Sequence, residues 1–133
     1  MSKYVPVFRG DELFDNLGIR SVSILKIDVE GAELEVLSGL RNTISRTKPF
    51  VLCEVLPVYE ESSQQGKMRR KRSDEITEII SALGYKIVRL LHDGTAVSLE
   101  TIATHADLKL CEYLFVPEEF VEVVHTQLDL VKK

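Results

Sequence analysis

Residues 25–33 read Leu25-Lys26-Ile27-Asp28-Val29-Glu30-Gly31-Ala32-Glu33, an apolar run interleaved with charges and followed by a glycine. The alternating apolar side chains predict the tail of a buried strand, so Lys26, Asp28 and Glu30 share its other face. A buried charge must find a partner or shift its pKa. Open α/β sheets place their ligands where a parallel strand ends and a helix begins. The stretch therefore predicts a catalytic or binding site.

A purely structural interpretation of the same stretch stays open. An acidic residue just before a helix interacts favourably with the dipole at the helix amino terminus. Lys26 could also simply form an ion pair with Asp28. The residue types alone do not separate this interpretation from a functional site.

Composition limits the class of protein. The 133 residues are one domain's worth of chain, and we expect a single domain over 1–133. The chain is 44% hydrophobic and 29% charged, and no apolar stretch approaches the roughly 20 residues that span a bilayer. The amino terminus has no apolar signal-peptide core, so we expect a cytoplasmic protein without membrane contact. A net charge of −4 argues against nucleic acid as a partner.

The two cysteines, Cys53 and Cys111, each lie inside an apolar run. Neither has a second cysteine at the spacing of a metal site. We therefore expect buried thiols in a reducing compartment.

Hydrophobic periodicity predicts an α/β fold in which strands and helices alternate. The order is strand, helix, strand, helix, and then strands with little helix between them, which predicts parallel pairing followed by an antiparallel edge. The polar segment 57–72 is interpreted as a long loop or a frayed helix start. Predicted strands cover 23–29, 50–56, 85–91, 95–99 and 109–116, and predicted helices cover 11–17, 31–45 and 73–83. Gly18 is expected to end the first helix and Ser73 to cap the start of the last one. Asp93-Gly94 is expected to form the turn between the strands 85–91 and 95–99.

Residues 24–39 resemble the signature of FkbM-type methyltransferases. The segments Asp11-Glu12-Leu13-Phe14, 50–55, Gly84-Tyr85, Asp93-Gly94 and 113–117 follow in the order of that family. The resemblance implies an S-adenosylmethionine-dependent O-methyltransferase that acts on a hydroxyl of a sugar, polyketide or related small molecule. It also implies a partial Rossmann-like methyltransferase sheet, with this chain supplying strands four to seven.

The glycine-rich turn of the family's first strand has no counterpart here, since the seven glycines are scattered. We therefore expect the carboxy-terminal half of the enzyme, which binds S-adenosylmethionine weakly or not at all when alone. Strand four would then present an unpaired edge, and a homo-oligomer, for example a dimer, could form across it. The alternative is a non-catalytic oligomerising or scaffolding module with a degenerate methyltransferase fold.

The resemblance places Asp28 beside the transferred methyl group, where it could accept the proton of the substrate hydroxyl or orient that hydroxyl. Glu30 and Glu54, at the ends of neighbouring strands, could share this work. These three carboxylates would raise one another's pKa, and Lys26 would oppose that rise. A divalent metal held by them is a weaker alternative, and we predict none.

Three further residues are candidates for substrate binding. His92 precedes the Asp93-Gly94 turn and could act as an acid or base, although a histidine in that position is more often a surface residue. Arg69 and Arg70 belong to the basic run 67–72, which could hold an acidic substrate. A solvated charged segment explains the run equally well, and a nucleic-acid contact is a weaker alternative.

Overall fold

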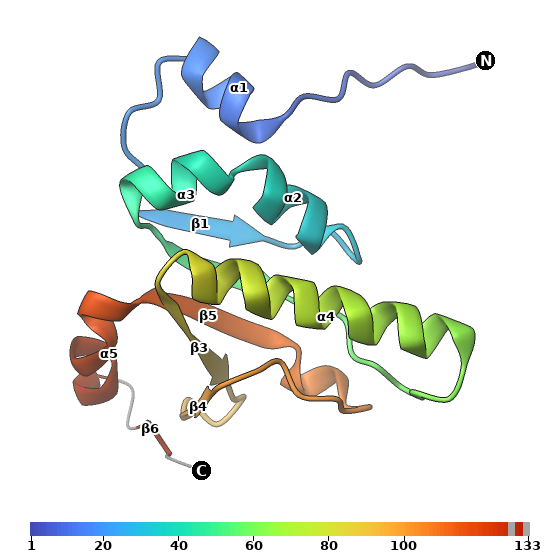
Figure 1. The fold of residues 1–133 in the computed structure, drawn as a ribbon, viewed down its shortest axis with the longest axis vertical. Helices are drawn as coiled ribbons and strands as arrows, with labels where there is room; N and C mark the ends of the chain where they lie inside the picture. The colour runs from blue at the N-terminus through green and yellow to red at the C-terminus, as the bar shows by residue number, and fades with distance from the viewer. Residues whose placement is uncertain (128–129, 132–133) are drawn as a thin grey trace.

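The computed structural model describes residues 1–127 and 130–131, and it has the predicted α/β architecture (Figure 1). The strands in this part of the chain form one mixed sheet in the order β1-β2-β5-β3-β4-β6. Their bounds are β1 Ile24–Ile27, β2 Phe50–Glu54, β3 Tyr85–Leu90, β4 Ala96–Leu99, β5 Glu112–Pro117 and β6 Leu130–Val131. The helices are α1 Gly10–Asn16, α2 Glu33–Gly39, α3 Arg41–Thr47, α4 Gln64–Ala82 and α5 Val121–Gln127, with short 3-10 turns at Leu108–Leu110 and Glu118–Phe120.

The strand pairing confirms a parallel start and an antiparallel continuation. β1 and β2 are parallel, whereas β5 lies antiparallel between β2 and β3, and β4 is antiparallel to β3. β1 pairs with β2 alone among the strands described, so one edge of the sheet is unpaired, as predicted. The parallel β1 and β2 therefore end at the same edge of the sheet, which is where the acidic residues were predicted to meet.

The main core lies between one face of the sheet and helices α2, α3 and α4. Tyr113 and Phe115 of β5 point into it because alternate strand residues share a face, and Ile44 of α3 and Ile80 of α4 pack in the same cluster. A smaller cluster on the opposite face packs Val88 and its neighbours against α5. The long helix α4 runs across the sheet in Figure 1 and forms one wall of the site described below.

Helix α1 is attached to α3 through the buried carboxylate of Asp11. Its oxygens accept hydrogen bonds from the backbone N–H of Asn42, the backbone N–H of Thr43 and the Thr43 hydroxyl, at 3.0, 2.8 and 2.7 Å. Burial alone would raise the pKa of Asp11, but these hydrogen bonds outweigh burial and hold the pKa below its usual value. Asp11 therefore caps the first turn of α3 from a distant position in the sequence.

The structure corrects the prediction for the polar segment. Helix α4 begins at Gln64, so the basic run lies on the helix, and the option of a loop through residue 72 was wrong. Ser63 is the N-cap, and its hydroxyl oxygen accepts the N–H of Gly66 at 3.0 Å. Ser73, predicted as the cap, is buried inside the helix. An ion pair between Arg70 and Asp74 spans one turn and supports the helix through the charged region.

Other boundaries differ by smaller amounts. The predicted helix 31–45 is two short helices that meet at Leu40, and the second continues to Thr47. The last predicted strand begins later, at Glu112, because a 3-10 turn occupies Leu108–Leu110. The Asp93-Gly94 turn is confirmed, and Gly94 has the positive φ of +85° that such a turn requires.

Both cysteines are buried free thiols, as predicted. Burial raises the pKa of the Cys53 thiol well above its usual value and that of Cys111 to about 11. Both therefore remain protonated at neutral pH and are poor nucleophiles. In the residues that the structure describes, no helix is long and apolar enough to cross a membrane.

Candidate active site

The link between β1 and α2 is a tight turn with two unusual backbone conformations. Glu30 has a φ of +48° and Gly31 a φ of +110°. A positive φ at a residue other than glycine is uncommon and is often found at functional sites. The turn is held by the Glu33 side chain, whose Oε1 accepts the N–H of Gly31 at 2.7 Å. The backbone thus reverses sharply at the position where the sequence predicted a site.

The charged side chains at the end of β1 and directly after it are exposed, and the prediction that they are buried was wrong. The side chains of Lys26 and Asp28 are 67% and 46% exposed, and Lys26 Nζ lies 3.3 Å from Asp28 Oδ2. β1 is an edge strand, and alternate residues along it are exposed. The structural alternative of a Lys26–Asp28 ion pair is therefore realised, and it leaves Asp28 accessible to a ligand.

The carboxylates at the strand ends do gather, as the parallel pairing predicted. The pKa of the Glu54 carboxyl is raised, first by partial burial and then by the charge and hydrogen bonding of Asp28, with smaller effects from Glu112 and Glu30. Because Ile27 pairs with Cys53, Asp28 and Glu54 follow directly at the ends of two neighbouring strands, and the charge of Asp28 acts on Glu54. The roles assigned to these residues remain predictions.

Beside this cluster lies a cavity of about 400 Å³ between the β1–α2 turn, the end of β2 and the first half of α4. Glu30 and Arg69, two of the predicted site residues, both line it, whereas Lys26, Asp28 and Glu54 lie outside its lining. Arg70 and His92 are absent from its lining. The exposed His92 lies instead beside a much smaller hollow of about 30 Å³. The cavity is lined by Glu30, Gly31, Ala32, Glu33, Glu35, Val55, Leu56, Gln65, Met68, Arg69, Arg72, Ser73 and Ile76.

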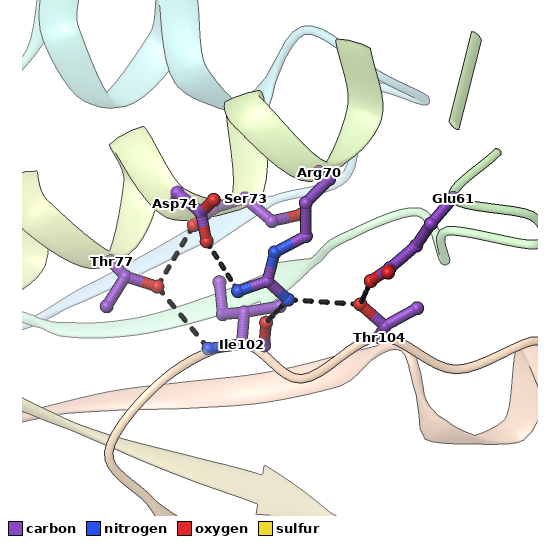
Figure 2. Close-up of polar contacts among 7 residues, drawn as sticks. All are labelled: Glu61, Arg70, Ser73, Asp74, Thr77, Ile102 and Thr104. Atoms are coloured by element: carbon purple, nitrogen blue, oxygen red, sulfur yellow. Dashed lines mark hydrogen bonds and ion pairs between the residues drawn. The ribbon is translucent and has the colours of Figure 1, made fainter. Parts of the chain in front are cut away.

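Arg70 is occupied by a structural contact, which Figure 2 shows. Its guanidinium donates to the carbonyl of Ile102 at 3.2 Å, to the hydroxyl of Thr104 at 3.1 Å and to Asp74 at 2.6 Å. Thr77 of the same helix accepts the N–H of Ile102 at 3.3 Å. Arg70 thus fastens the segment between β4 and β5 to α4.

Sequence reasoning named neither Glu33 nor Glu35 as a site residue and considered Arg72 only as part of the basic run, but the structure places all three in the cavity wall. Glu33 is almost completely buried, and Arg72 of α4 is paired with Glu35 of α2 across the cavity. The hydrogen bond from Arg72 lowers the pKa of Glu35. The position of Glu33, two residues after Gly31 and at the start of the predicted helix, could have indicated a contact with the turn. Because the segment that contains Arg72 was interpreted as a loop or a frayed helix start, there was no reason from the sequence to place Arg72 opposite α2.

No group of three or more His, Cys, Asp or Glu side chains within residues 1–127 and 130–131 is arranged to hold a metal ion.

The raised pKa of Glu54 predicts a pH-dependent effect of Glu54→Gln. A carboxyl whose pKa is raised on folding stabilises the fold below its unfolded pKa, and this contribution is lost as pH rises through the folded pKa. Glu54→Gln should therefore become more stable than the parent as pH rises from about 4 to about 7, by less than about 1 kcal/mol because water screens the cluster.

The measurement is urea unfolding at both pH values. Glu78→Gln, on the exposed side of α4 and outside the charged neighbours of Glu54, is the control. An equal response of the two variants to pH would show that Asp28 and Glu54 do not repel each other.

Comparison with known proteins agrees with this geometry. The family model described as the methyltransferase FkbM domain matches residues 2–87. Hexuronic acid methyltransferase AglP of Haloferax volcanii is 37% identical over 54 residues, which cover 41% of this chain and 22% of AglP. The match therefore spans less than a quarter of that relative. No solved structure matches the chain significantly.

The fold is that of the open α/β class, in which ligands are usually bound at the ends of the parallel strands. Within that class, the chain belongs to the FkbM methyltransferase family.

Proposed function

We propose that this chain forms the acceptor side of an S-adenosylmethionine-dependent O-methyltransferase site, with a hydroxyl of a sugar or related small molecule as the methyl acceptor. The observation that carries the proposal is the gathering of Asp28, Glu54 and Glu30 at the ends of β1 and β2, beside a cavity of about 400 Å³. The family supports methyl transfer, and the name of the partial relative, a hexuronic acid methyltransferase, supports a sugar ring as the acceptor. The acidic lining of the cavity in this chain favours a ring that carries no carboxylate.

Asp28 is the residue we propose for the chemistry. Its accessible carboxylate can accept the proton of an acceptor hydroxyl, and Lys26 at 3.3 Å keeps that carboxylate in place. Glu54 shares this environment and can orient the same hydroxyl. S-adenosylmethionine, when bound, supplies an electrophilic methyl group on a sulfonium.

The residues described here fit the acceptor better than the cofactor. The 133 residues contain no glycine-rich turn between a strand and a helix of the kind that holds such cofactors. We propose that the chain alone is a weak binder of S-adenosylmethionine, that its strands correspond to strands four to seven of the Rossmann-like sheet, and that it works in the cytoplasm.

A second candidate function is a non-catalytic module that associates with itself. The observation that favours it is the unpaired edge of β1, where the large apolar side chain of Ile24 is 71% exposed. Exposed strand edges pair readily with other strands, so a homo-oligomer through β1 is part of this proposal.

Calorimetric titration with S-adenosylmethionine tests the proposal and separates the two candidates. The 133-residue chain should give no saturable binding, whereas a longer form, extended upstream in its own reading frame, should bind and transfer methyl. Tight binding by the shorter chain would contradict our placement of the cofactor. Failure of both forms to bind, or a reading frame without an upstream extension, would favour the non-catalytic module.

A further inference from the structure

The cavity between α2 and α4 is lined by three glutamates and two arginines, and Glu33 is the one of these glutamates that is buried. Glu33 is 4% exposed, and the described residues supply it with a single hydrogen bond, from the N–H of Gly31 to Oε1. It is not part of any ion pair that they form. Its other oxygen accepts no hydrogen bond from the described residues and is not sealed from solvent, so a donor in the cavity can reach it.

The two guanidiniums that line the cavity are already engaged elsewhere. Arg72 is paired with Glu35 through both of its terminal nitrogens and also donates to the Gly31 carbonyl at 2.9 Å. Arg69 donates to the Pro57 carbonyl at 3.3 Å and lies 5.5 Å from the centre of the Tyr59 ring. Neither guanidinium forms an ion pair with Glu33, and three glutamates against two arginines give the cavity lining an excess of negative charge.

The remaining lining is apolar. Val55 and Leu56, where the chain leaves β2, and Met68 and Ile76 of α4 form a surface suited to the carbon face of a ring. A cavity that combines such a surface with a hydrogen-bond acceptor suits a ligand with one apolar face and an edge rich in hydroxyl or amino donors.

We propose that Glu33 is a specificity-determining residue that accepts hydrogen bonds from hydroxyl or ammonium groups of the acceptor, so that this cavity selects a neutral or cationic sugar unit and rejects a carboxylated one. The proposal deepens the proposed function, on which it rests, by naming the substrate class. An ammonium group binds best because its hydrogen bond to the carboxylate is charge-assisted, whereas a ligand carboxylate meets repulsion from Glu33 and Glu30 and finds Arg72 paired with Glu35.

The test uses three ligands that share one ring: methyl glucoside, its 2-amino analogue and its 6-carboxylate analogue. Each is titrated into the isotopically labelled 133-residue chain, and binding is followed by amide NMR shifts. We expect shifts at Gly31, Ala32 and Val55, with the amino sugar binding about tenfold more tightly than the carboxylate and the neutral sugar between them. Equal or tighter binding of the carboxylate, or no shift with any ligand, would overturn the proposal.

Two variants change the charge of the cavity in opposite ways. Glu33→Gln keeps an oxygen for the Gly31 N–H but removes the charge, so the preference for the amino sugar should fall to within about twofold. Glu35→Gln frees Arg72 and should instead strengthen binding of the carboxylate. Unchanged preferences in both variants would assign the selectivity to other residues and overturn the role of Glu33.

These measurements do not depend on methyl transfer. Correct sugar selectivity in a protein that never transfers methyl would refute the proposed enzyme and keep the cavity assignment. Methyl transfer with no preference among the three sugars would support the proposed enzyme and refute the role of the cavity.

Discussion

Asp28→Asn is expected to lower the rate of methyl transfer by about 10²–10⁴-fold, the usual contribution of a general base. Asparagine has nearly the same size but does not take up the proton of the acceptor hydroxyl. The loss should appear in kcat, while the affinity for S-adenosylmethionine stays close to that of the parent. The measurement is transfer of labelled methyl to the acceptor, in the form of the protein that the titration shows to bind the cofactor.

Asp15→Asn is a matched control for this change. Asp15 is also an exposed aspartate in an ion pair, with Arg46 at 3.7 Å, but it lies on α1 outside the carboxylate cluster. We expect it to keep the parent rate. A full rate in Asp28→Asn would remove Asp28 from its proposed role and leave Glu54 as the remaining partner of the hydroxyl.

Gly66→Ala is expected to destabilise the protein by about 3 kcal/mol, at the upper end of the usual range for overpacking. A Cβ atom at Gly66 would lie 1.5 Å from the carbonyl oxygen of Glu60, so backbone would have to move. The movement would displace the start of α4 and, with it, Gln65 and Met68 in the cavity wall. Thermal and urea unfolding measure the loss.

Gly39→Ala is the control for the loss of a glycine. The added Cβ would meet the Gly10 nitrogen at 3.6 Å, which is ordinary contact, and Gly39 lies at the end of α2. Because alanine favours a helix over glycine by roughly 0.5–1 kcal/mol, this variant should be as stable as the parent or slightly more so. Equal stability of the two variants would show that the approach of Gly66 to Glu60 is less tight than the structure indicates.

The meeting of acidic residues at the strand ends could be predicted from sequence because it depends only on the position of each residue in its strand and on parallel pairing of the two strands. Alternation locates Asp28 and Glu54 relative to the two strands, and parallel pairing brings the ends of those strands to one edge. The exposure of these side chains could not be predicted in the same way, because it depends on the position of β1 in the sheet and not on the local sequence. The strand order was equally beyond local pattern, because β5 is inserted between β2 and β3 by contacts distant in sequence.

The start of α4 shows where local rules become ambiguous. Ser63 and Ser73 both precede helix-compatible residues, and the acidic pair after Ser73 favoured it as the cap. Ser63 is the N-cap in the structure, because the first half of α4 is stabilised by tertiary contacts such as the ion pair between Arg72 and Glu35. Propensity alone does not contain such contacts.

The hydrogen bonds from Asn42 and Thr43 to Asp11 set the minimum extent of an independently folding fragment. A shortened version that started at β1 would retain every described strand but leave the amino-terminal N–H groups of α3 without that acceptor. Residues 10–16 thus belong to the cooperative unit, although they contribute no strand and line no part of the cavity. Domain limits drawn from the sheet alone would divide this unit.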